Sequence, residues 1–212
     1  AELAIDLSDV MDVVLTHNHG DHTGGLVTLR QELSKKNPRA LTRAHVGKGI
    51  FLPRPGANGS DGNGLLHFKA AFEALGGAFV EHAEPVEILP SVWLTGPVPR
   101  AHPEPNWSNL GQVKTPDGLV EDTIPEDTSI AIITQDGLVL VSGCGHAGMI
   151  NTVEYARKVA GAAPVLAAIG GFHLFEATDA TLEWTAARLR AAGLRHLLGA
   201  HCTGIEAVYR LL

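Results

Sequence analysis

The chain has 212 residues, with 16 Lys and Arg against 23 Asp and Glu, so its formal net charge is −7. Because nucleic-acid backbones are bound through clustered basic side chains, this balance argues against a nucleic-acid partner. An apolar content of 45% excludes a disordered acidic chain. No window holds the ~20 uninterrupted apolar residues of a membrane span, and the length fits a single domain.

The chain contains two cysteines, Cys144 and Cys202. Two are too few for the disulfide framework of a small secreted domain. One disulfide between them stays open, but a reducing compartment is favoured. We therefore expect a cytoplasmic protein.

The first half of the chain predicts short strands with two helices. The apolar run 10–15 is typical of a buried strand. Leu26, Leu29 and Leu33 share one face of a helix that Asn37-Pro38 would end. The Pro-, Gly- and Asn-rich residues 53–64 predict a surface loop, and residues 65–75 a helix. Further strands are expected at 41–46, 78–82, 86–89 and 92–95.

The second half predicts a layered α/β fold. Residues 97–127 hold six prolines and little periodicity, which is typical of a long irregular connection such as a lid or substrate loop. A hairpin is expected around Gln135-Asp136-Gly137. Helices and strands should then alternate on a mixed sheet, within one domain. The expected elements are strands at 129–134, 138–141, 164–169 and 195–199, and helices at 148–160, 178–192 and from about 204.

A dense group of polar side chains follows the first strand. His17, His19, Asp21 and His22 lie within six residues, closed by Gly24-Gly25. Side chains two apart in extended backbone point to the same side, so His17 and His19 can reach one ion. Asp21 and His22, across the turn, can reach a second. Imidazole nitrogen and carboxylate oxygen are ligands of zinc and related ions, so this window predicts a metal site; the alternative is a polar turn with surface histidines.

Further histidines follow predicted strands, where residues of open α/β sheets gather around ligands. His146 and His201 are predicted metal ligands in these positions. His173 ends another strand and is expected to be a ligand, or to transfer a proton or contact substrate, with a local structural role as the alternative. Cys144 and Cys202 neighbour His146 and His201; either could lie near the metals, or each could be a small buried residue.

Three weaker candidates complete the set. His102 in the long connection could contact substrate. Glu126 and Asp127, just before the expected hairpin, could support the site or cap an element. For His102 a role away from the substrate is the favoured alternative, and for Glu126 and Asp127 direct metal ligation is the less favoured one.

The window Thr16-His-Asn-His-Gly-Asp-His-Thr-Gly-Gly25 resembles the signature of the metallo-β-lactamase superfamily. Three later segments narrow the resemblance: 142–153, Gly170-Gly-Phe-His-Leu174 and His201-Cys-Thr-Gly204. Together they look like the subgroup named after dihydropterin–ribofuranosylaminobenzene-phosphate synthase. The resemblance implies an αββα sandwich with a metal site at one edge of two sheets. By this match His17 and His19 bind one metal, Asp21 and His22 the other, and His201 belongs to the final histidine motif.

The chain departs from the superfamily pattern in two places. Many members have a histidine where this chain has Asp127-Thr-Ser129, and a bridging Asp where it has Cys144. His146 is therefore expected to be a ligand of either metal, and without a bridging carboxylate the second site is expected to be weaker or empty. Members also carry an N-terminal β-rich stretch before the strand at 10–15. We expect residues 1–212 to be one N-terminally incomplete domain, its natural form longer or covered there by another segment.

The predicted site suggests metal-dependent chemistry on a small-molecule substrate. Two divalent ions about 3.5–4 Å apart can hold a hydroxide and polarise a substrate oxygen. We expect hydrolysis of an ester or phosphoester by metal-bound hydroxide, with Asp21 orienting the hydroxide and His173 donating a proton or holding an anionic group. One or two ions are expected, zinc first, with Fe, Mn or Ni as alternatives. Two other functions stay open: a transferase that condenses a dihydropterin with a ribofuranosylaminobenzene phosphate, and a non-catalytic metal-binding or redox module.

Overall fold

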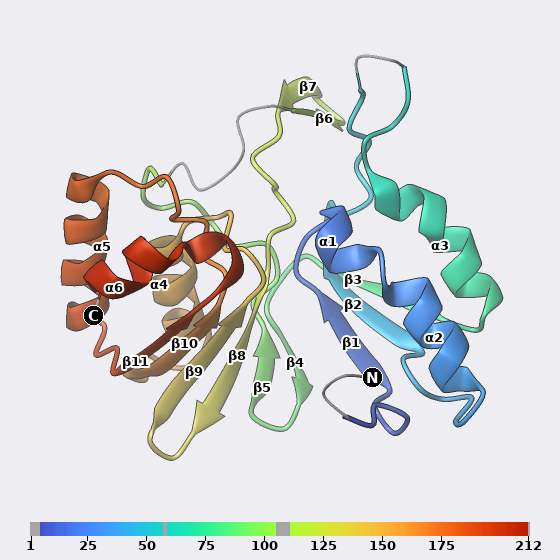
Figure 1. Ribbon diagram of the computed structural model, residues 1–212, viewed down its shortest axis with the longest axis horizontal. Helices are drawn as coiled ribbons and strands as arrows, with labels where there is room; N and C mark the ends of the chain where they lie inside the picture. The colour runs from blue at the N-terminus through green and yellow to red at the C-terminus, as the bar shows by residue number, and fades with distance from the viewer. Residues whose placement is uncertain (1–4, 57–58, 105–110, 212) are drawn as a thin grey trace.

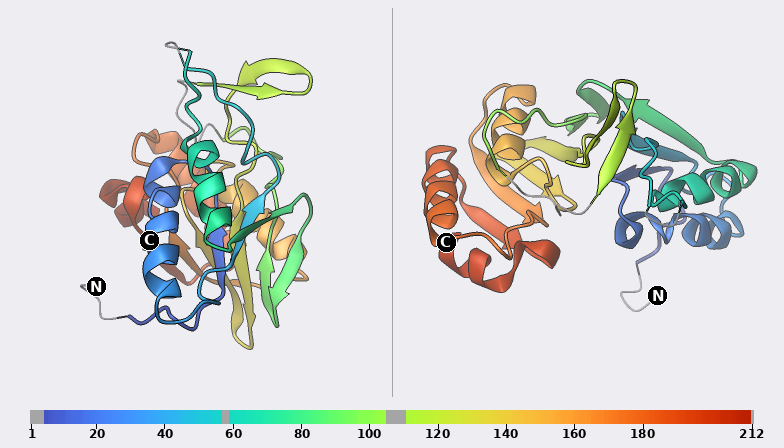
Figure 2. Two further views of the ribbon diagram at one scale, coloured as in Figure 1. Left: turned by 90° about the vertical axis from the view of Figure 1, so that its right-hand side faces the viewer. Right: turned by 90° about the horizontal axis from the view of Figure 1, so that it is seen from above.

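Two β-sheets lie between two layers of helices (Figures 1 and 2). The computed structural model describes residues 5–56, 59–104 and 111–211. Helices α2 and α3 pack on the smaller sheet, and α4, α5 and α6 pack on the larger one. This layering confirms the αββα sandwich expected from the sequence. Among the described residues, no helix combines the length and apolar character needed to cross a membrane.

The larger sheet has the strand order β11-β10-β9-β8-β5-β4. Strands β9, β10 and β11 are parallel to one another, whereas β8 is antiparallel to both of its neighbours. The elements of this half are β4 Val86–Leu89, β5 Val92–Leu94, β8 Ser129–Thr134, β9 Gly137–Ser142, α4 Met149–Val159, β10 Val165–Gly170, α5 Asp179–Ala191, β11 His196–Gly199, a 3₁₀ turn His201–Thr203 and α6 Ile205–Leu211.

The smaller sheet is parallel, with the order β1-β2-β3. A separate antiparallel hairpin, β6 and β7, projects away from both sheets (Figure 1). The elements of this half are β1 Asp12–Leu15, α1 Gly20–Thr23, α2 Leu26–Ser34, β2 Arg43–Gly47, α3 Gly64–Ala74, β3 Ala78–His82, β6 Gln112–Thr115 and β7 Gly118–Glu121.

Each sheet has its own apolar core on its helix-covered face. Leu140 of β9 and Leu182 of α5 belong to the cluster beneath α4, α5 and α6. Val46 of β2 packs with Leu65 and Phe72 of α3 in the other cluster. Alternating burial along β9 follows from the two-residue period of a strand, which turns every second side chain toward the helices. These two cores fix the strands whose ends carry the candidate site.

The sequence-based elements largely agree with the structure, and two differences stand out. The sequence predicts an irregular segment over 97–127, of which residues 105–110 lie outside the described residues. Within the described part, β6 and β7 form a hairpin, whose alternation is too short to stand out beside the prolines. On α2, Leu29 is 46% exposed and does not share the buried face expected for it. Arg30 is buried instead, and its guanidinium donates to the carbonyls of Ala40 and Leu75 at 2.6 and 2.7 Å.

Candidate metal centre

The polar side chains of interest follow strands that end on the same side of the molecule. In the larger sheet, the loops after β9, β10 and β11 carry Cys144 with His146, then His173, then His201. In the smaller sheet, the segment after β1 carries the window that begins at His17. Because parallel strands place their carboxyl ends at one edge, these loops meet where the two sheets approach each other (Figure 1).

Close backbone contacts join these loops. The amide of Gly171 donates to the carbonyl of Gly143 at 3.1 Å, and the amide of Thr128 donates to the carbonyl of Thr16 at 3.0 Å. A Cβ atom at Gly143 would lie 2.0 Å from Oγ1 of Thr16. A Cβ at Gly171 would lie 2.2 Å from the carbonyl oxygen of Gly143. Glycine is therefore required for the loops to approach as closely as they do.

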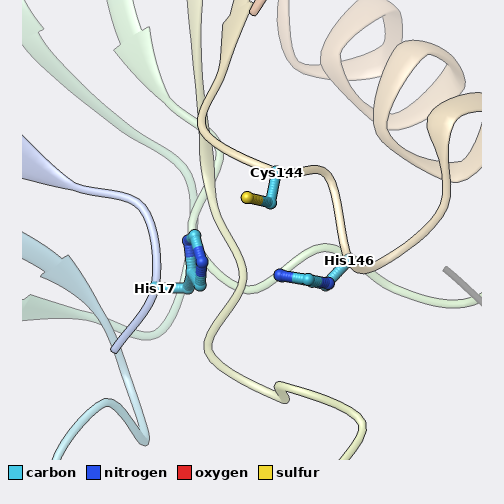
Figure 3. A group of neighbouring side chains, drawn as sticks. All are labelled: His17, Cys144 and His146. Atoms are coloured by element: carbon cyan, nitrogen blue, oxygen red, sulfur yellow. The ribbon is translucent and has the colours of Figure 1, made fainter. Parts of the chain in front are cut away.

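Three histidines form an inner group. The ring centroids of His17 and His19 lie 4.6 Å apart, and each lies 4.8 Å from the ring of His146. His17 and His146 are fully buried. Figure 3 shows these two side chains and Cys144 directed toward a common space, and their ligand atoms all lie within 4.8 Å of one another. These donors therefore lie in loops that follow strands of both sheets.

Three further side chains form an outer group. Nε2 of His22 lies 3.2 Å from Nε2 of His201. Oδ2 of Asp21 lies 3.4 Å from Nε2 of His22 and 3.1 Å from Nε2 of His201. Unlike the inner group, these side chains reach the surface, with exposed fractions of 55% for Asp21, 22% for His22 and 47% for His201. The short helix α1 places Asp21 and His22 on this outer side.

Cys144 lies between the two groups. Its Sγ is 3.2 Å from Nε2 of His22, and it belongs both to a donor set with His17 and His146 and to one with His22 and His201. The residue is 3% exposed. The sequence left open whether Cys144 lies near the metals, and the structure places it against both donor groups.

The protonation of the histidines favours cation binding. Burial lowers the pKa of His17, His19 and His22, so these imidazoles stay neutral near pH 7. Nδ1 of His17 is 3.0 Å from Oγ1 of Thr16. Nε2 of His17 is buried without a hydrogen-bond partner among the described residues. A neutral ring with one nitrogen held and the other free is the form in which histidine binds metal, so His17 fits a divalent ion.

Buried carboxylates support the loops around the site. Oδ2 of Asp127 accepts a hydrogen bond from the amide of Ala147 at 2.8 Å, next to His146. Burial raises the pKa of Asp127 to about 7. Glu126 accepts from the amide of Asn18 at 3.2 Å and from the guanidinium of Arg54 at 2.7 Å. The acidic pair is thus placed for a supporting role, one of the two roles expected from the sequence.

Arg54 is a residue that sequence reasoning missed. It is 7% exposed and also donates to Asp122 at 2.5 Å, so one guanidinium joins two buried carboxylates. Its position in a Pro- and Gly-rich loop gave no sign of burial. The one available signal was charge: the loop holds a lone arginine, and acidic residues lie near 122–126.

Among the described ring contacts, His173 reaches the inner group through His146 alone, whereas His17, His19 and His146 all contact one another. Its ring centroid is 4.7 Å from that of His146, and its backbone has φ of +45°. Nδ1 of His173 is buried without a hydrogen-bond partner among the described residues. His102 lies elsewhere: Nε2 bonds Glu154 at 2.9 Å, and the residue lines a separate cavity of about 390 Å³ with Trp184. The structure therefore brings His17, His19, Asp21, His22, His146 and His201 together, and their role as metal ligands stays a prediction.

Comparisons with known proteins find one matching family model and two curated relatives. A sequence model of the metallo-beta-lactamase superfamily matches residues 1–154. The 7,8-dihydropterin-6-methyl-4-(beta-D-ribofuranosyl)-aminobenzene-5'-phosphate synthase of Methanocaldococcus jannaschii is 31% identical over 211 residues, which cover 97% of this chain and 70% of the relative. An uncharacterized protein of the same organism is 30% identical over 206 residues, covering 94% of this chain and 71% of the relative.

A solved structure shares the fold. The crystal structure of a metal-dependent hydrolase of the beta-lactamase superfamily superposes with a TM-score of 0.76 and 24% sequence identity. The match covers 99% of this chain and 74% of that protein. At this identity the likeness concerns the fold.

Proposed function

Because this chain belongs to the metallo-beta-lactamase superfamily, we propose that its two donor groups bind divalent metal and serve a reaction on a small-molecule substrate. The observation that carries this proposal is the convergence of six imidazole and carboxylate side chains from three distant chain segments. His17, His19 and His146 would hold one ion, and Asp21, His22 and His201 the other. Zinc suits this ligand chemistry best, with Fe, Mn and Ni as alternatives.

Bound ions would lower the pKa of water and polarise a substrate oxygen. The protein side chains would orient the ligands and contact the substrate. Oδ2 of Asp21 lies against both outer imidazoles and would fix their orientation. His173, at the edge of the inner group, is placed to donate a proton to a leaving group or to hold an anionic substituent.

The unequal exposure of the two groups favours catalysis over a purely structural metal site. Structural sites close all positions around the ion, whereas catalytic sites keep one open. His17 and His146 are fully buried, but Asp21 and His201 are about half exposed. A substrate would approach over the outer group. A cavity of about 220 Å³ lined by His22, Val14 and Val141 adjoins this group.

Two reactions fit such a site. The relative named as a synthase, 31% identical over nearly the whole chain, favours transfer: the joining of a dihydropterin to a ribofuranosylaminobenzene phosphate. The site chemistry alone also suits hydrolysis of an ester or phosphoester. We place transfer first because the curated similarity extends along 97% of this chain.

One assay separates the two reactions. The metal-loaded protein is incubated with a dihydropterin that carries a leaving group on its 6-methyl carbon, with and without the ribofuranosylaminobenzene phosphate. Transfer predicts a joined product by mass spectrometry that needs both compounds. Hydrolysis predicts loss of the leaving group to water whether or not the ribofuranosylaminobenzene phosphate is present, or turnover of other esters in a panel.

His17→Ala is the matched test of the metal site, since His17 is buried at the centre of the inner group. We expect loss of bound metal and of turnover in this variant. His196→Ala serves as the control, because His196 is exposed on β11, outside both groups. Full activity in His17→Ala would contradict the proposal.

A further inference from the structure

One peptide group in the loop after β9 is held at both of its polar atoms by charged side chains. The guanidinium of Arg100 donates from Nη1 to the carbonyl oxygen of His146 at 2.7 Å. The amide of Ala147, in the same peptide group, donates to Oδ2 of Asp127 at 2.8 Å. We propose that Arg100 and Asp127 are positioning residues that clamp this peptide and so hold the ring of His146 in the inner group. The inference rests on the proposed function, because it concerns a ligand of the same site.

The loop that carries His146 has little means of fixing its own conformation. Residues 143–148 include three glycines, and φ is +57° at Gly145 and +105° at Gly148. Because glycine restricts the backbone less than any other residue, such a segment has many alternative conformations. The amide of Gly148 donates to the carbonyl of Gly145 at 2.9 Å and closes a turn. The central peptide of this turn is the one that the clamp binds.

The two clamping side chains are themselves held in place. Asp127 is 1% exposed, and the amide of Val98 donates to its carbonyl oxygen at 3.0 Å. Arg100 also donates from Nη2 to the carbonyl oxygen of Thr123. Burial lowers the pKa of Arg100 and the charge of Asp127 acts against that shift, so the two charges stabilise each other. The clamp therefore ties the loop after β9 to two distant parts of the chain.

The clamp acts on a ligand of one ion and not of the other. The ring of His146 lies 4.8 Å from those of His17 and His19. Among the described residues, the donor set around His22 and His201 does not include His146. Loss of the clamp should therefore weaken the binding of the inner ion selectively.

Arg100→Met gives the sharpest test, because charge and position predict opposite results. Removal of a positive charge close to a bound cation would by itself strengthen metal binding. Loss of the clamp should instead weaken binding of the inner ion by about 10–100-fold, the usual effect of removing a group that orients a ligand. Cobalt titration in competition with a coloured chelator measures both affinities, and His146→Ala identifies the inner ion as the one it loses. Unchanged or stronger binding in Arg100→Met would overturn the inference.

Arg30→Met is the matched control. Arg30 is also a buried arginine that donates to two backbone carbonyls, but its partners Ala40 and Leu75 lie outside both donor groups. This variant should lower the melting temperature and leave both metal affinities unchanged. A loss of inner-ion affinity equal to that of Arg100→Met would reduce the effect to general instability and count against the clamp.

Two variants of Asp127 remove the same charge but differ in what remains. Asparagine keeps an oxygen that can accept a hydrogen bond from the amide of Ala147, whereas alanine does not. We expect Asp127→Ala to weaken the inner ion as Arg100→Met does, and Asp127→Asn to stay close to wild type. Equal losses in the two variants would make charge or direct ligation the cause and overturn the clamp.

Amide hydrogen exchange of metal-free wild type covers the case in which a variant fails to fold. The clamp predicts slow exchange at the amide of Ala147 before any metal binds, because its acceptor is a buried side chain. Rapid exchange there would overturn the inference. The titrations separate the two proposals: a wild type that binds no metal overturns both, whereas two bound ions with unaltered affinities in Arg100→Met and Asp127→Ala overturn the clamp alone.

Discussion

At the scale of single residues, the surroundings of His17 favour its proposed role as a metal ligand. One ring nitrogen is held by Thr16, and the other is buried with no hydrogen-bond partner among the described residues. An unpaired buried nitrogen costs free energy, which a bound cation would recover. The hydroxyl of the adjacent Thr16 should therefore orient the His17 ring for metal binding as well as stabilise the fold.

Thr16→Val keeps the shape of the side chain and removes the hydroxyl next to Nδ1 of His17. We expect metal affinity to fall by about 10–100-fold, the usual effect of removing a group that orients a ligand. Competition with a coloured chelator measures the affinity. Thr16→Ser should retain it, and equal affinities in the Val and Ser variants would refute the orienting role.

The motif histidines were predictable from the sequence because their spacing is local. His17, His19, Asp21 and His22 lie within one turn, where backbone periodicity alone indicates which side chains can share an ion. The position of Cys144 was not predictable. Whether a cysteine after a strand faces a cavity or the core depends on how that loop packs against Thr16, a contact across 127 residues of sequence.

At the scale of elements, the site depends on a close approach between the segments that follow β1 and β9. This approach requires glycine at position 143. The loop after β9 touches the segment after β1 only because Gly143 has no side chain. These two segments carry His17 and, after β9, Cys144 and His146, so their separation controls the distances between these donors.

Gly143→Ala should force these segments apart, because its Cβ would lie 2.0 Å from Oγ1 of Thr16. We expect weaker binding of both metal ions and a lower melting temperature. Gly118→Ala in the β6–β7 hairpin is a comparison with a positive φ but no neighbouring atoms within 4 Å. It should lower stability without lowering metal affinity. Unchanged metal affinity in Gly143→Ala would contradict this account of the loop contact.

Strand and helix positions were largely predictable because each buries one face in a regular pattern. Long-range polar contacts were not. The ion pairs of Arg54 with Asp122 and Glu126 join segments about 70 residues apart, and no local pattern signals them. The hairpin β6–β7 was missed because its residues are mostly exposed, so burial leaves little alternation in the sequence.

At the scale of the whole molecule, the buried histidines make the stability of the metal-free protein depend on pH. Burial lowers the pKa of His17 below its usual 6.5, so the unfolded chain binds more protons below that pH. The stability contributed by the neutral ring is present above about pH 6.5 and is lost as pH falls. Asp127 acts in the opposite sense: its pKa is raised to about 7, so its buried carboxyl favours the folded state as pH falls from 7 toward 4.

We therefore expect His17→Asn to flatten the decline in unfolding free energy below pH 6.5, by up to about 1.4 kcal/mol per pH unit. Asp127→Asn should make the decline steeper. Urea unfolding of chelator-treated protein at pH 7, 6 and 5 provides the measurement. A slope in His17→Asn equal to that of wild type would show that this ring does not stay neutral in the folded state.

The most direct test of the paired donor groups is anomalous scattering from crystals of the metal-loaded protein. We expect two peaks, one contacted by His17, His19 and His146 and the other by Asp21, His22 and His201. Metal bound elsewhere, or six donors that coordinate nothing in a fully loaded crystal, would contradict this expectation.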